Sequence, residues 1–126
     1  MTAKVRVLIV DDVRLVLTSL KRMLERAGFH VEAADSGAAA LALLERTEVD
    51  VVLSDFMMPA MNGIELLREV SARWPRVRRA ILTAQAEKDL LDRALADGLL
   101  EAAFQKPWDN QELCVFCGNG RPNQLA

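Results

Sequence analysis

Short apolar runs alternate with amphipathic stretches along this chain, and the alternation predicts strands and helices in turn. The runs Val5–Val10 and Val51–Asp55 are mostly aliphatic, which is typical of strands buried on both faces of a parallel sheet. Leu17, Leu20 and Leu24 recur at helical spacing. The same patterns predict strands at 5–10, 29–34, 51–55, 79–83 and 102–104, and helices at about 13–27, 38–48, 64–74, 87–96 and after 109.

Strand and helix thus alternate five times, which predicts an α/β fold: a five-stranded parallel sheet with right-handed crossovers and helices on both faces. With 126 residues, the chain is expected to form a single domain spanning 1–126. Asp109, with Glu112 three residues later, is a typical start for the fifth helix. That helix should be short, because Gly118, Gly120 and Pro122 follow it closely.

Composition narrows the function classes. A net charge of −2 disfavours a surface that coats nucleic acid, so we expect no direct nucleic-acid partner. No apolar run approaches the roughly 18 residues of a membrane span, and the N-terminus has no apolar signal region. Two cysteines cannot form a disulfide framework. We therefore expect a cytoplasmic protein that does not contact the membrane.

Polar side chains follow the predicted strands at their carboxyl ends. Asp11 and Asp12 follow the first strand, Asp55 ends the third, Thr83 ends the fourth, and Lys106 comes just after the fifth. Parallel strands bring these ends to one edge of the sheet. Three carboxylates at one place repel each other, and a hard divalent cation such as Mg²⁺ would relieve that repulsion. We expect Asp12 and Asp55 to bind Mg²⁺ directly and Asp11 to act through water.

A carboxylate is a known covalent nucleophile, and the one we expect to react is Asp55. Its attack on phosphorus would give an aspartyl phosphate. The charge on the phosphoryl oxygens would then be shared by Mg²⁺, the Lys106 ammonium and the Thr83 hydroxyl.

These residues stand in local motifs that resemble the receiver domain of bacterial two-component response regulators, of the chemotaxis-receiver type. The motifs are Leu8–Asp12, Asp55–Pro59 followed by Met61–Gly63, and Lys106–Asp109, with Thr83 between them. The resemblance covers about residues 4–113, and the motifs occur in the right order and at the right spacing.

The resemblance implies a flavodoxin-like domain with strand order 2-1-3-4-5 that takes a phosphoryl group from a sensor histidine kinase or phosphotransfer protein onto Asp55. The backbone carbonyl of Met57 would join Asp12 and Asp55 as a Mg²⁺ ligand. Thr83 would then move, switching a surface made by the fourth helix, fifth strand and fifth helix for an output domain or downstream protein. A homodimer through that face or through the C-terminal tail is an open alternative. The Lys106–Pro107 bond is typically cis in this family.

Two features depart from the family. The position three residues before the lysine, usually aromatic, is Ala103, and Phe104 should point to the opposite face of its strand. This puts coupling through a ring in doubt. The segment 114–126 is an atypical tail, which could pack on its own domain or on a neighbouring chain.

Other functions and motifs remain open at this point. One alternative is a Mg²⁺-dependent phosphohydrolase with an aspartyl nucleophile, but it would need a general acid near Asp55, and Met57 cannot serve as one. Another is a receiver-like scaffold that is not phosphorylated, but such a scaffold would not need the three aspartates. We therefore favour a signalling module that only phosphorylates and dephosphorylates itself. Cys114 and Cys117 form a CxxC without a second pair, which favours packing over metal or redox chemistry. The arginines around Trp74 are interpreted as a solvated loop: Arg73, Arg76, Arg78 and Arg79.

Overall fold

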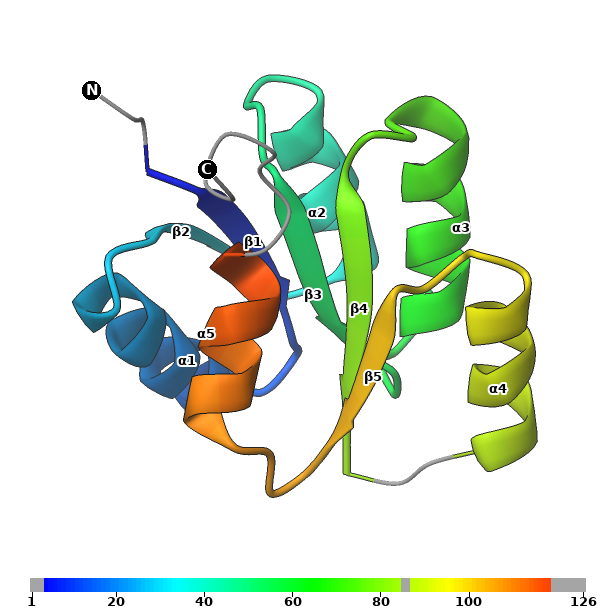
Figure 1. Ribbon diagram of the computed structural model, residues 1–126. Coiled ribbons are helices and arrows are strands. Elements are labelled where there is room, and N and C mark those ends of the chain that lie inside the picture. Colours follow the sequence, from blue (N-terminus) through cyan, green and yellow to red (C-terminus); the bar gives the residue numbers. More distant parts are fainter. Residues whose placement is uncertain (1–3, 85–86, 119–126) are drawn as a thin grey trace, which may run out of the picture.

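The computed structural model describes residues 4–84 and 87–118, and their strands form one parallel sheet in the order β2-β1-β3-β4-β5 (Figure 1). The predicted α/β class and strand order are confirmed. The strands are β1 Arg6–Val10, β2 His30–Ala34, β3 Val51–Asp55, β4 Arg78–Thr83 and β5 Ala102–Gln105. The helices are α1 Arg14–Arg26, α2 Gly37–Leu44, α3 Gly63–Arg73, α4 Lys88–Ala96 and α5 Asn110–Gly118.

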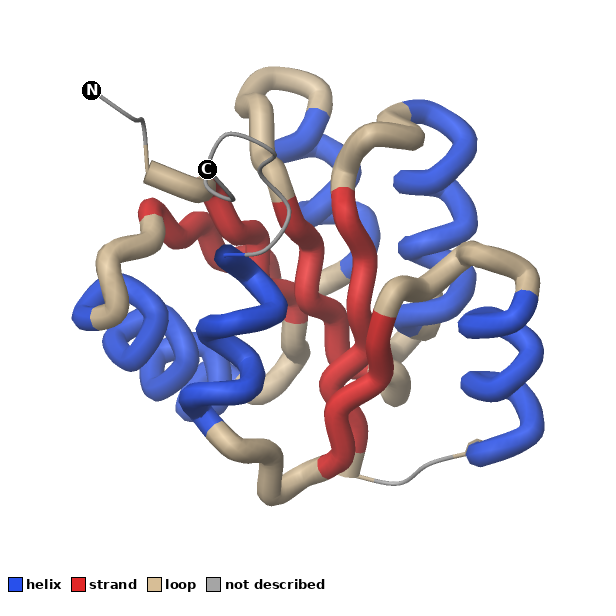
Figure 2. Tube along the Cα trace, in the orientation of Figure 1, coloured by secondary structure: helices blue, strands red, loops and turns tan. Residues whose placement is uncertain are grey.

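Helices cover both faces of the sheet, α1 and α5 on one side and α2, α3 and α4 on the other (Figures 1 and 2). Successive side chains of a strand point to opposite faces. Leu8 of β1 accordingly packs with the α2–α4 layer, whereas Val7 and Ile9 pack with α1 and α5. The sheet is therefore buried on both faces, as the continuous apolar runs predicted. None of the helices in the described part of the chain is long and apolar enough to cross a bilayer.

Local signals fix one end of each of three helices, α1, α3 and α5. Gly28, at φ 101°, ends α1 in a conformation that other residues rarely adopt. The Asn62 side chain accepts the Glu65 N–H at the start of α3, and the Glu65 side chain accepts the Asn62 N–H in return. Asp109 accepts the backbone N–H groups of two residues of α5 with one carboxylate oxygen, so the predicted cap is confirmed.

The second helix is shorter than predicted, because α2 ends at Leu44 and not at Glu48. The Asp50 N–H donates to the Arg6 carbonyl over 2.8 Å, which ties the segment before β3 to the start of β1. The residues between Leu44 and Asp50 must therefore leave the helix to bring β3 into the sheet. The Ala- and Leu-rich composition favoured a longer helix, and this tertiary constraint overrides it.

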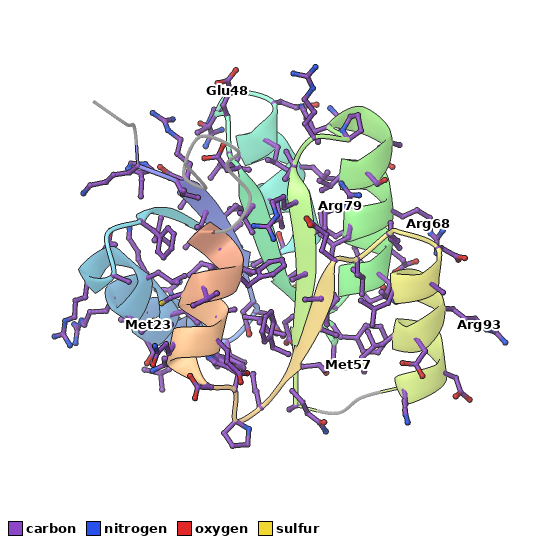
Figure 3. All side chains as sticks on the ribbon, in the orientation of Figure 1. Met23, Glu48, Met57, Arg68, Arg79 and Arg93 are labelled. Atoms are coloured by element: carbon purple, nitrogen blue, oxygen red, sulfur yellow. The ribbon has the colours of Figure 1, made fainter. Side chains whose placement is uncertain are left out.

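The interpretation of the arginine cluster as a solvated loop is wrong for two of its members. Arg78 and Arg79 belong to β4, and Arg79 is only 9% exposed (Figure 3). The Arg79 guanidinium donates to the carbonyls of Leu99 at 2.8 Å and Val77 at 2.6 Å. Weaker contacts reach two more carbonyls, those of Pro75 and Gly98. Arg79 thus satisfies carbonyl groups in the connections that precede β4 and β5, which its charge in the sequence did not reveal.

The fifth helix is short, nine residues against the thirteen of α1. Cys114 to Gly118, which the sequence assigned to an atypical tail, form the second half of α5. Residues 119–126 lie outside the described residues, so packing of the tail stays a prediction. Phe104 packs on the α5 side against Phe116, with ring centroids 5.5 Å apart, and Ala103 packs on the other face. The predicted departure at Ala103 is confirmed.

Candidate functional site

The polar strand ends meet at the carboxyl edge of the sheet. Asp11 follows β1 directly, and the pairing of Val10 with Ser54 sets it beside Asp55, the last residue of β3. Thr83 ends the neighbouring strand β4 and is buried. The backbone N–H of Lys106, just after β5, donates to the Thr83 carbonyl over 2.8 Å. The sheet therefore presents all the predicted side chains at one edge.

Three carboxylates form an acid cluster, defined by Asp11, Asp12 and Asp55, whose candidate ligand oxygens all lie within 4.8 Å of one another. Asp11 is buried, Asp55 half-buried and Asp12 exposed, so the cluster opens to solvent on one side. The nearest ammonium is that of Lys106, 3.9 Å from Asp11 Oδ2. A single cation cannot balance three carboxylates. The donor set, oxygen atoms only and open to water, fits a hard divalent cation.

Burial and mutual repulsion raise the pKa values of two of these groups. Desolvation by burial raises the pKa of Asp55 above its ordinary value of 3.8, and the neighbouring charge of Asp11 adds to the rise. Burial also raises the pKa of Asp11, although the Val13 N–H and Lys106 oppose that rise. The acid cluster therefore binds protons more readily than free carboxyl groups do, and a bound cation would compete with those protons.

The loop between β3 and α3 holds the Asp55 main chain closely. The Gly63 N–H donates to the Phe56 carbonyl over 2.8 Å, and a Cβ on Gly63 would lie 2.2 Å from the Asp55 carbonyl oxygen. The Ser54 hydroxyl donates to the same Asp55 oxygen over 2.9 Å. Sequence reasoning placed Asn62-Gly63 in a family motif and gave Gly63 no structural role of its own. The dipeptide signalled a special backbone position, but it could not name the atom that Gly63 approaches.

Three exposed apolar side chains lie within a few residues of the acid cluster in the chain, and we call them the apolar rim: Val13, Leu15 and Met57. Their exposures are 48%, 80% and 62%, and Met57 is labelled in Figure 3. Sequence reasoning assigned a role only to the Met57 carbonyl. The sequence could have identified Leu15 as an exposed apolar residue, because it lies off the stripe of α1 formed by Leu17, Leu20 and Leu24 and so should face solvent.

The turn after β5 places an aromatic ring beside the amine of the site. The Lys106–Pro107 peptide is cis, as the resemblance implied. Two residues later, the Trp108 ring centroid lies 5.7 Å from Lys106 Nζ, within the range of a cation–π contact. Trp108 also packs against the apolar cluster of α1 and α5. Lys106 is thus held between this ring and Asp11.

Comparison with known proteins agrees with this geometry. Residues 7–116 match the model of the response regulator receiver domain, and the chain belongs to that family. It is 39% identical over 102 residues to a response regulator receiver protein of Anaeromyxobacter sp. (strain Fw109-5), which covers 81% of the chain and 42% of that relative. It is 28% identical to the solved response regulator receiver domain protein of Clostridium thermocellum, with a TM-score of 0.87 over 96% of this chain and 97% of that one. It is 26% identical to the chemotaxis response regulator CheY4 of Vibrio cholerae, with a TM-score of 0.82 over 94% and 100%.

The chain is therefore a receiver domain with the flavodoxin-like fold of chemotaxis receivers, and receiver domains are signalling modules that interact with histidine kinases and output domains. It spans less than half the length of the curated relatives that it matches, 42%, 24% and 9% for three of them. What those longer proteins do as a whole is accordingly not carried over to this chain.

Proposed function

We propose that Asp55 accepts a phosphoryl group from a histidine kinase or phosphotransfer protein, and that the acyl phosphate switches a protein-binding surface. The observation that carries the proposal is the acid cluster, three carboxylates within 4.8 Å with the Lys106 ammonium 3.9 Å from one of them. The acid cluster can bind a cation, and the Lys106 amine lies beside it. Together they suit the transfer of a highly charged phosphoryl group.

Of the two carboxylates that the sheet edge partly or fully buries, Asp55 is the better placed to act as the nucleophile. Asp11 is 3% exposed, and its Oδ1 accepts the Val13 N–H over 2.8 Å, so it is shielded from an incoming phosphorus. Asp55 is half-buried at the end of β3, with its main chain held by Gly63 and Ser54. An Asp55 carboxylate oxygen would form the new bond to phosphorus while the bond to the donor nitrogen breaks, and the electron pair would leave with the imidazole.

Mg²⁺ would be held by Asp12, Asp55 and the Met57 backbone carbonyl, with Asp11 acting through water. When bound, it would neutralise carboxylate charge and withdraw electrons from a phosphoryl oxygen. The Lys106 ammonium would bind a second phosphoryl oxygen. The Thr83 hydroxyl would donate to a third without adding charge. Each role corresponds to a side chain at the same edge of the sheet.

The apolar rim supports a docking face for the phosphoryl donor. Val13, Leu15 and Met57 expose hydrocarbon within a few residues of the acid cluster, and a donor must approach that cluster to deliver its phosphoryl group. An amphipathic helix of the donor could cover this hydrocarbon while its histidine reaches Asp55. The proposed reaction takes place in the cytoplasm, and the free thiols of Cys114 and Cys117 suit a reducing compartment.

The output surface is proposed to be the face of α4, β5 and α5, where a homodimer could also form. Movement of Thr83 would reach that face through β5, because Thr83 pairs with Gln105. A partly buried alanine, Ala103, stands where the resemblance led us to expect a ring, so the proposal does not include coupling by an aromatic side chain at that position. We also propose that residues 1–126 are one receiver domain, that its output region is on the same polypeptide or a separate protein, and that it does not bind nucleic acid directly.

A phosphodonor that needs no kinase tests the chemistry directly. Incubation with acetyl phosphate and Mg²⁺ should add the mass of one phosphoryl group, and EDTA or Asp55→Asn should abolish the adduct. Asp92→Asn, which alters an exposed carboxylate of α4, is the matched control and should leave the adduct intact. Rapid multiple turnover of the donor would indicate a phosphohydrolase instead. A folded protein that forms no adduct would indicate a receiver-like scaffold.

A further inference from the structure

Two sulfur atoms from different helices meet on the face of the sheet covered by α1 and α5. The Cys114 thiol of α5 lies 3.5 Å from Sδ of Met23 of α1. Met23 is labelled in Figure 3. Cys114 is half-buried, and Met23 is partly buried against the apolar cluster of this face. The contact therefore joins the two helices through soft, polarisable atoms.

A third sulfur is supplied by the same helix. Cys117 is three residues after Cys114, a spacing that puts the two side chains on neighbouring positions of one helix face. Cys117 is 0% exposed and belongs to the apolar cluster against which Met23 and Cys114 pack. Met23 thus places a third sulfur beside the first cysteine of the CxxC, which the sequence alone did not reveal.

We propose that Met23, Cys114 and Cys117 form a binding site for a soft monovalent metal ion, Cu⁺. Thiolate and thioether sulfurs are soft ligands that suit Cu⁺. The thioether points away from Zn²⁺, whose usual ligands are thiolates, imidazoles and carboxylates. Across residues 4–84 and 87–118, no histidine or carboxylate completes a three-membered ligand group with the two cysteines, which disfavours harder ions such as Zn²⁺. The ion would link α1 and α5. Its sulfur ligands differ from the carboxylate oxygens of the acid cluster, so the two sites would bind different kinds of cation.

A route to the sulfurs is open from solvent. A groove of about 610 Å³ between α1 and the start of α5 is lined by Met23 and Cys114, together with Ser19, Arg26, Asn110 and Gln111. Cu⁺ entering by this groove would meet the thioether and the first thiol before the enclosed Cys117. Two of the three ligands are therefore reachable without unfolding the helix.

Nearby positive charges offset part of the cost of burying thiolates at this site. Binding would release one proton from each thiol and leave two thiolates, one thioether and Cu⁺, a net charge of −1. Arg78 lies near enough to Cys117 to favour its thiolate, and Arg22 and Arg26 line the groove beside Cys114. Burial raises the pKa of the Cys117 thiol to about 12 and that of Cys114 above its ordinary value. Binding should therefore weaken steeply as the pH falls, with two protons released per ion.

Competition for Cu⁺ tests the proposal. The full chain, reduced and kept under anaerobic conditions, is titrated with Cu⁺ in the presence of the chromogenic chelator bicinchoninate. We expect one ion per chain, three sulfur neighbours by X-ray absorption, and an affinity that rises with pH as two protons are released. Met23→Leu should weaken binding about tenfold and Cys114→Ser about a hundredfold.

The controls distinguish specific Cu⁺ binding by the three sulfurs from non-specific binding of Cu⁺ to reactive thiols. Met61→Leu alters a methionine packed on the opposite face of the sheet and should leave Cu⁺ affinity unchanged. Cys117→Ser could unfold the buried layer, so the proton count measured on the wild-type chain tests the role of Cys117 without that variant. Equal affinities of Met23→Leu and Met61→Leu, release of a single proton, or failure to compete with the chelator would each overturn the proposal.

Discussion

Gly63 and the Asp55 carbonyl approach each other so closely that no side chain fits between them. A Cβ on Gly63 would lie 2.2 Å from the Asp55 oxygen and 2.7 Å from Ile81 Cδ1. Both the loop after β3 and the position of the proposed phosphoacceptor therefore depend on glycine at position 63, which has no side chain.

Gly63→Ala should consequently lower both stability and phosphorylation. The main chain at Asp55 must shift, and overpacking of this kind costs about 1–3 kcal/mol of unfolding free energy. Urea unfolding and the initial rate of labelling by acetyl phosphate measure the two effects. Gly118→Ala is the control, because its Cβ would meet only Phe29 at 4.0 Å. Equal labelling rates for the two variants would contradict the dependence of Asp55 on Gly63.

The raised pKa of Asp55 predicts how stability changes with pH in the metal-free protein. The folded state binds a proton at Asp55 more tightly than the unfolded state, whose carboxyl titrates near 3.8. Unfolding free energy is therefore lost as the pH rises through the folded-state pKa, and both states are protonated well below 3.8.

Asp55→Asn should accordingly be more stable than the wild type at about pH 7 in EDTA, with the advantage shrinking as the pH falls toward the unfolded-state pKa. Urea unfolding of both proteins across this range measures the difference. Asp92→Asn should show no comparable trend. An advantage of Asp55→Asn that grows as the pH falls would mean that the pKa is lowered in the folded state and not raised.

The buried guanidinium of Arg79 predicts a large effect far from the acid cluster. Replacement by Met keeps much of the hydrocarbon stem but leaves the Val77 and Leu99 carbonyls without their donor. We expect a loss of about 3 kcal/mol of unfolding free energy. Arg68→Met, an exposed arginine of α3 (Figure 3), should change it by less than about 0.5 kcal/mol. Chemical unfolding of both variants measures the two losses. Similar unfolding free energies for the two variants would show that the four carbonyl contacts contribute little.

The apolar rim predicts a defect that depends on the phosphoryl donor. Leu15→Gln should lower kcat/KM for transfer from a sensor kinase about tenfold, since an exposed anchor worth more than about 1 kcal/mol is removed. Labelling by acetyl phosphate should be unchanged, because that donor is too small to cover α1. Val115→Gln removes an equally apolar side chain, 53% exposed on α5, and should leave both rates intact. A parallel loss with both donors would place the effect on folding or chemistry and not on docking.

The sequence predicted most of the carboxyl edge because each candidate residue follows a recognisable apolar strand. The end of a parallel strand fixes where the next side chain lies, so Asp11, Asp55 and Lys106 could be brought together from spacing alone. Features that depend on contacts between distant segments were missed. Arg79 was misjudged because its charge suggests exposure to solvent, whereas two of the carbonyls it binds, those of Gly98 and Leu99, lie far along the chain. The early end of α2 likewise depends on a hydrogen bond from Asp50 to β1.

The ring beside Lys106 also gives the protein a built-in optical probe. Indole emission responds to a nearby ammonium, and Trp108 lies 5.7 Å from the amine proposed to bind the phosphoryl group. The other indole, Trp74, stacks under Arg73 at the opposite edge of the sheet. In a Trp74→Phe background, phosphorylation should therefore change the fluorescence intensity of a single tryptophan, and Asp55→Asn should remove the change. Signal kinetics could then be followed in unlabelled protein.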